Sequence, residues 1–125
     1  MNVTIQNARL QQVANALSDI GQDRPRGIAA LLAVHARAVA KAMQEVEEAR
    51  RDLIQAHDPP TPQGWESDAP QDVVDAVNEL YRLDTEITVP LKLPAEYFVR
   101  DDATFRPESA VILWEAGLAD EPTFD

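Results

Sequence analysis

Residues 28–57 lie within the longest stretch of this chain without glycine or proline, and they limit its possible folds more than any other feature. Apolar and small side chains repeat there every seven residues, in the set Leu32, His35, Val39, Ala42, Val46, Ala49 and Leu53. This period predicts one helix of about 45 Å with a narrow apolar seam, whose small residues let another helix approach closely. Because so long a helix exceeds the usual span of a domain of this size, the rest of the chain or a second copy must cover the seam.

Helical patterns flank this stretch on both sides. Residues 7–20 place apolar side chains at helical spacing, and residues 70–83 do the same after a proline-containing segment. Because the turn before residue 28 is short, the first helix and the long helix are expected to form an antiparallel hairpin. Residues 107–116 predict a last short helix. Its inward side chains are predicted to be Ala110, Val111, Trp114 and Leu118.

Alternating apolar side chains from Ile87 to Leu93 predict a half-buried strand, with residues 3–5 or 97–99 as its candidate partner. Pro90 removes a backbone donor and therefore favours an edge position. We expect an α+β fold that is mostly helical: a long antiparallel helical hairpin, a third helix, a minimal edge sheet and a short C-terminal helix. Residues 1–118 are expected to form a single domain with a mobile loop at 58–69, followed by an acidic tail at 119–125.

Charge excludes several classes of partner. The chain has 22 acidic and 11 basic residues, a net charge of −11. Direct binding of nucleic acid requires dense basic clusters, which this sequence lacks, and contact with an anionic membrane surface is disfavoured for the same reason. No apolar run approaches the roughly 18 residues that crossing a bilayer requires. We therefore expect no direct contact with nucleic acid or membrane.

The sequence offers little material for catalysis. Cysteine is absent, and the two histidines, His35 and His57, are too far apart in sequence to form a zinc-binding pair. The acidic residues Glu45, Glu48 and Asp52 share one helix face, which we interpret as solvated. We expect no enzyme, no metal and no cofactor.

Positive charge gathers near the start of the long helix. Arg24, Arg26 and Arg37 lie there, and arginines beside a helix N-terminus can bind an anion such as a nucleotide. These three residues form an alternative binding site. In a homo-oligomer, such a cluster would be repeated around the symmetry axis.

Three segments carry a family resemblance. Residues 46–54 read VEEARRDLI, residues 78–93 read NELYRLDTEITVPLKL, and residues 106–115 read RPESAVILWE. In this order they resemble small, uncharacterised proteins of tailed bacteriophages and prophages. The resemblance covers residues 28–116 and departs at Trp114, where these proteins usually have an aliphatic residue. It implies a viral origin and a small α+β fold, and it supplies no catalytic residues.

The leading hypothesis is a non-enzymatic, phage-encoded accessory protein that self-associates through the seam residues named above. It would also bind a protein partner, in the virion (tail or head-to-tail region) or in the host, and so act in the virion or in the host cytoplasm. One alternative is a homo-oligomeric anti-defence protein that sequesters a nucleotide signal. The other is an acidic inhibitor that mimics nucleic acid and binds a basic host enzyme.

Overall fold

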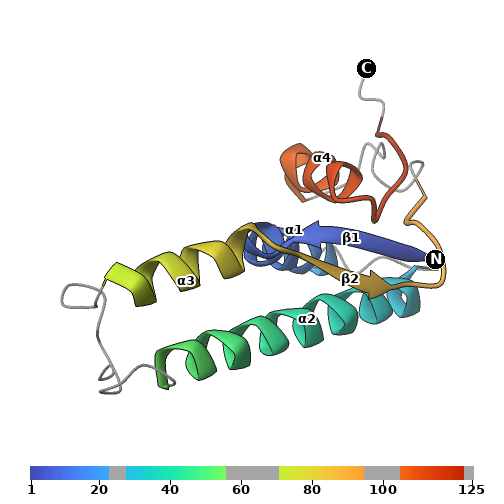
Figure 1. Cartoon of the computed structure of the whole chain (residues 1–125). Coiled ribbons are helices and arrows are strands. Elements are labelled where there is room, and N and C mark those ends of the chain that lie inside the picture. Colours follow the sequence, from blue (N-terminus) through green and yellow to red (C-terminus); the bar gives the residue numbers. More distant parts are fainter. Residues whose placement is uncertain (23–27, 56–70, 95–104, 123–125) are drawn as a thin grey trace.

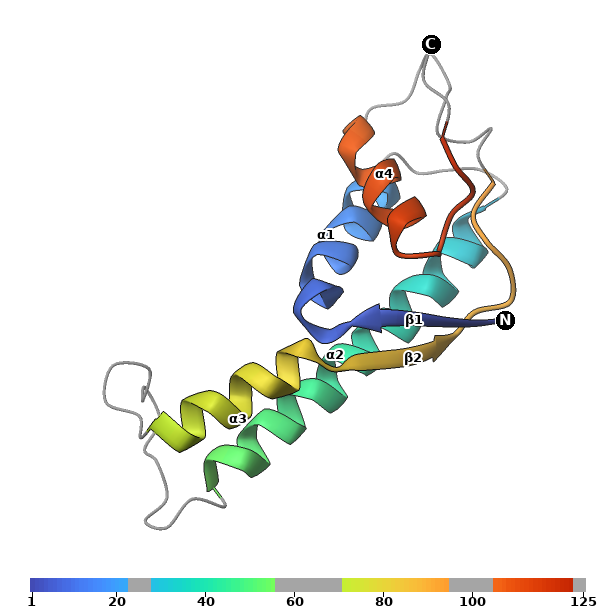
Figure 2. The same ribbon diagram turned by 45° about the horizontal axis from the view of Figure 1, so that its top comes forward.

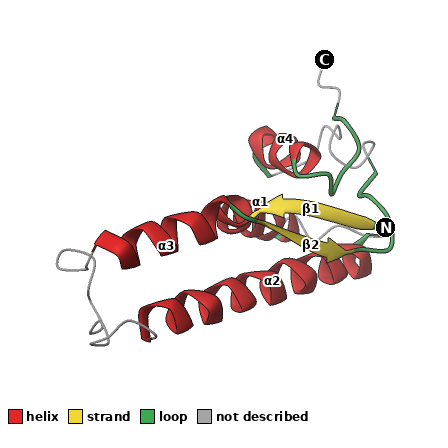
Figure 3. Cartoon of the chain, viewed as in Figure 1, coloured by secondary structure: helices red, strands yellow, loops and turns green. Residues whose placement is uncertain are grey.

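A computed structural model describes residues 1–22, 28–55, 71–94 and 105–122. Helices dominate it, and two strands form the only sheet within those residues, so the fold is α+β and mostly helical, as predicted (Figures 1 and 3). The elements in chain order are β1 (Asn2–Gln6), a 3-10 turn η1 (Asn7–Arg9), α1 (Leu10–Gly21), α2 (Ala29–Gln55), α3 (Gln71–Arg82), β2 (Asp84–Thr88) and α4 (Pro107–Glu115).

The sheet joins the N-terminal segment to the segment that follows α3. β1 and β2 are antiparallel, with Val3 opposite Ile87. One face of the sheet is apolar, with Val3, Ile5 and Ile87 buried, whereas the side chains between them are exposed or only partly buried. This alternation is what a sheet with one solvated face requires. Pairing between residues 3–5 and the second strand is therefore confirmed, and residues 97–99 lie outside the described residues.

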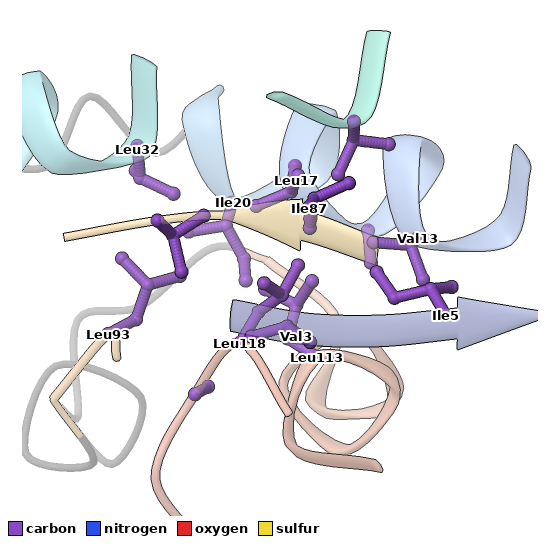
Figure 4. Close-up of a cluster of buried hydrophobic side chains, with 14 of the residues drawn as sticks. Val3, Ile5, Val13, Leu17, Ile20, Leu32, Ile87, Leu93, Leu113 and Leu118 are labelled. Carbon is purple, nitrogen blue, oxygen red and sulfur yellow. The ribbon is translucent and has the colours of Figure 1, made fainter. Parts of the chain in front are cut away.

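The main core lies between the apolar face of the sheet and the helices α1, α2 and α4. Figure 4 shows side chains from β1, β2 and α1 converging with Leu32 of α2, with Leu113 of α4 and with Leu118, which follows α4. The residues Leu10, Val13, Leu17 and Ile20 are all buried, as the helical spacing of residues 7–20 predicts. α1 packs against both α2 and α4.

The C-terminal half of α2 leaves this core and pairs with α3. In Figures 1 and 2, α3 runs beside that half of α2, away from α4. Ile54, Val73 and Val77 form a small second core there, with Val74 and Tyr81 packed against it. We call this pair of helix segments the α2–α3 arm.

Asn7 fastens the arm to the main body. Its backbone N–H donates to the Leu83 carbonyl at 2.9 Å, and its side-chain amide donates to the Leu80 carbonyl at 2.8 Å. Its side-chain oxygen accepts a hydrogen bond from the Thr85 hydroxyl. The last carbonyls of α3, which a helix leaves unpaired, are thus partly satisfied by a residue from the start of the chain.

Three local expectations are wrong. Trp114 is 40% exposed, and Leu113 is buried in its place. The regular strand ends at Thr88, and Leu91 is 57% exposed, because the chain turns away at Pro90. Ala119 is fully buried and pairs with Leu93, so the tail begins later than residue 119. The loop at 58–69 lies outside the described residues.

Candidate functional site

An apolar groove of about 790 Å³ runs between α1 and α2. Small residues from both helices line it. A space remains between the two helix backbones because alanine and serine side chains are short and glycine has none. Among the described residues that line it, none has an ionisable side chain. Its lining residues are Ala14, Leu17, Ser18, Gly21 and Gln22 of α1 and Ala29, Leu32, Ala33, Ala36, Ala40 and Met43 of α2.

The α2 wall of the groove is a row of exposed alanines. Ala29, Ala33, Ala36 and Ala40 are spaced alternately by four and three residues and all are exposed. This is the spacing at which one helix meets another along a continuous seam. The Ala33 carbonyl accepts a hydrogen bond from Nε of Arg37 at 3.3 Å, but Arg37 itself lines the groove between α2 and β2 and not this one.

The predicted self-association seam lies mostly on a different face of α2. Leu32, His35, Val39 and Ala42 are all buried in the chain's own core, and of these only Leu32 also lines the floor of the α1–α2 groove. Val46 and Ala49 are partly buried, and Leu53 is 37% exposed. The chain therefore covers the first half of the seam by itself, through α1 and the sheet, while the second half lies along the arm.

His35 is fully buried, and it ties α2 to the segment after β2. Its Nε2 lies 2.8 Å from the Leu91 carbonyl, which can only accept, so Nε2 carries the proton and donates. Its Nδ1 is buried without a hydrogen-bond partner among the described residues. Burial lowers the pKa of His35 from its ordinary value of 6.5, and the hydrogen bond with Leu91 opposes that shift only in part. His35 is a neutral packing residue, and nothing places it at a reactive site.

A second groove, of about 550 Å³, lies between α2 and β2. Its charged side chains are Arg37, Lys41, Glu45 and Glu86, two of each sign. Of the three arginines predicted to bind an anion, Arg37 is exposed on α2, and Arg24 and Arg26 lie outside the described residues. The predicted cluster therefore stays a prediction.

The described residues contain no group of three or more histidine, aspartate or glutamate side chains that could hold a metal ion. Of the helices in this part of the chain, none is long and apolar enough to cross a membrane. Comparison with protein-family models, with curated proteins and with solved structures finds no match for the chain. The grooves on α2 are therefore the features from which a function must be argued.

The sequence contains a repeat of alanines that corresponds to the α1–α2 groove, but it overlaps with the more apolar repeat of the predicted seam. Two seven-residue patterns overlap on α2, one made of larger residues such as Leu32 and Val39, and one made of the four alanines. The larger residues form the core, because burying them removes more apolar area from water. The alanines are left on the surface, where they form the groove.

Proposed function

We propose that this chain is a non-enzymatic accessory protein that self-associates and binds a protein partner, using the groove between α1 and α2. The observation that carries this proposal is the neutral, apolar lining of a groove bordered by two helices. A helix with a narrow apolar face fits such a groove, and this is a common way for proteins to recognise one another.

A second copy of the chain is the first occupant we propose. Identical surfaces meet across a two-fold axis, so a row of small residues on one copy faces the same row on the other. Antiparallel packing of two α2 helices about Ala40 brings Ala36 of each copy near Met43 or Gln44 of the other. Small side chains let the two helix backbones approach closely, which increases their van der Waals contact.

The setting of this association is proposed from the resemblance to tailed-phage proteins. In that setting the assembled protein contacts a phage or host protein, in the virion or in the host cytoplasm. Sequestration of a nucleotide has no comparable support, because Glu45 and Glu86 lie in the same groove as Arg37 and Lys41 and would repel an anion. Mimicry of nucleic acid is an alternative that rests on the net charge of −11 alone.

Solution mass tests the proposal, measured by size-exclusion chromatography with light scattering on wild type and on Ala36→Glu. We expect wild type to form a discrete oligomer and Ala36→Glu to elute as a monomer of 13.8 kDa. Ala36 is exposed, so the new carboxylate remains solvated in the monomer, whereas the association would bury it without a partner. Ala42→Glu is unsuitable, because Ala42 is only 2% exposed and the change would disrupt the fold.

Ala30→Glu is the matched control. Ala30 is exposed on the same helix but does not line the groove, so this variant should keep the mass of wild type. A monomeric wild type would contradict self-association. An oligomer that both variants retain would mean that copies meet at another surface.

A further inference from the structure

Within the described residues β2 pairs with β1 alone, so its outer edge has no strand partner there. Met1 and Val89 exchange two backbone hydrogen bonds, and the N–H of Asn7 donates to the Leu83 carbonyl. In an antiparallel pair, hydrogen-bonded and non-hydrogen-bonded positions alternate. The register therefore directs the N–H and C=O groups of the even-numbered residues away from β1, and these residues are Asp84, Glu86 and Thr88.

The groove between α2 and β2 lies beside this edge. Glu86, Ile87 and Thr88 form one of its walls, and α2 forms the other. On α2, the half-buried side chains Val34 and Ala38 provide apolar surface at the groove. A strand placed in this groove would pair with β2 on one side and lay alternate side chains on α2, because strand side chains alternate between two faces.

The groove lining carries charges of both signs, with Arg37, Lys41 and Glu45 on α2 and Glu86 on β2, so the preference for a basic occupant rests on the charges beside the edge of β2 alone. Asp84 and Glu86 are exposed, and their side chains lie on the face opposite Ile87. A residue directly opposite each of them on an added strand would point to the same solvated face, where opposite charges attract. The net charge of −11 attracts a basic segment at longer range as well.

We infer that the groove between β2 and α2 binds an extended segment of another protein, which adds to β2 as a third strand. That segment alternates basic residues, opposite Asp84 and Glu86, with apolar residues that face Val34 and Ala38. This surface is distinct from the groove between α1 and α2, so the inference does not rest on self-association there.

A second copy of β2 is a poor occupant of this edge. The antiparallel pairing of two β2 strands with the greatest overlap places Glu86 opposite Glu86. Like charges directly opposite each other in a sheet are destabilising, and acidic residues on an edge strand protect it from pairing with itself. Pairing Glu86 across the strands with a lysine or arginine of another chain removes this repulsion.

A short synthetic peptide that alternates lysine with valine, capped at both ends, is the probe. Titrating it into isotope-labelled protein should shift the amide resonances of Glu86 and Thr88 saturably and slow their hydrogen exchange. Glu86→Lys should weaken binding by at least about fivefold, because it replaces attraction with repulsion at a cross-strand pair. Glu115→Lys changes the net charge equally on an exposed position of α4, and should leave binding within about twofold of wild type.

Methylated peptides test the backbone contacts. One is methylated at the lysine backbone nitrogens and the other at the valine nitrogens, so each removes donors from one edge of the added strand only. We expect one of the two to lose binding and the other to retain it. Equal binding by both, no saturable shift at Glu86 and Thr88, or equal weakening by Glu86→Lys and Glu115→Lys would each overturn the inference.

Discussion

At the scale of single residues, we expect His35 to make the fold sensitive to mild acid. Its neutral ring donates one hydrogen bond to the Leu91 carbonyl, and its second nitrogen has no acceptor within the described residues. Protonation would place a charge and an unsatisfied N–H in the core, and both are costly. Burial lowers the pKa of His35 in the folded chain for this reason.

The pH dependence of stability follows from that shift. Because the folded pKa of His35 lies below the ordinary value of 6.5, the unfolded chain takes up this proton first as pH falls. The free energy of unfolding should therefore decrease from about pH 6.5 downward, until the folded pKa is passed. Urea denaturation at a series of pH values between neutral and mildly acid measures this slope.

His35→Gln separates this effect from general acid sensitivity. The glutamine amide still offers a donor toward the Leu91 carbonyl but does not titrate, so its slope should be nearly flat in this window. A slope that survives in His35→Gln would show that a group other than His35 is responsible.

Asp19 of α1 forms hydrogen bonds with the start of α4, which is far from it in sequence, and so connects the two helices. Its carboxylate accepts hydrogen bonds from the Ser109 hydroxyl at 2.6 Å and from the Arg106 backbone N–H at 2.9 Å, at the start of α4. These bonds lower the pKa of Asp19 below 3.8. We expect Asp19→Asn to lower the free energy of unfolding at neutral pH by about 1–2 kcal/mol, measured by urea denaturation.

The difference in the free energy of unfolding between wild type and Asp19→Asn should depend on pH. The advantage of the Asp19 carboxylate is present above its unfolded pKa and disappears as pH falls through the lower folded value, so wild type and Asp19→Asn should converge below about pH 3.8. Asp120→Asn removes an exposed carboxylate and should change stability by less than about 0.5 kcal/mol. An effect of Asp120→Asn as large as that of Asp19→Asn would contradict the capping role.

At the scale of elements, local patterns predicted most of the described structure. The long helix begins at Ala29 and ends at Gln55, within two residues of its predicted bounds, because an uninterrupted run of helix formers determines its extent locally. The first, third and last helices agree to within a few residues. The pairing of β1 with β2 was one of two predicted options, and only their apolar alternation was visible in the sequence.

The features of the elements that the sequence did not predict depend on tertiary contacts. α4 is apolar on most of its surface, so its sequence did not distinguish Leu113 from Trp114 as the buried residue. The cap provided by Asp19 and the bridge between Leu93 and Ala119 join residues far apart in sequence, and no periodicity reports such contacts. The candidate groove was missed because coverage of the seam depends on how α1 and the sheet dock on α2.

At the scale of the whole molecule, α2 spans two cores of unequal size. The main core unites eighteen buried residues of the described chain, and the core of the α2–α3 arm unites three. Local stability follows the apolar area that a region buries, so the two ends of one helix should open at different free energies. Hydrogen bonds of Asn7 hold the near end of α3, but the far end depends on Ile54, Val73 and Val77.

Native-state hydrogen exchange should therefore reveal a gradient along α2, with amides at residues 35–42 more protected than those at residues 50–54. Val77→Ala removes apolar contacts from the arm core alone, a loss of about 2 kcal/mol. It should speed exchange in α3 and at residues 50–54 by roughly thirtyfold while leaving residues 35–42 nearly unchanged. Val13→Ala, in the main core, should instead speed exchange along all of α2, because the arm cannot remain folded without the body that carries it. Equal protection at both ends of wild-type α2 would mean that body and arm unfold as one unit.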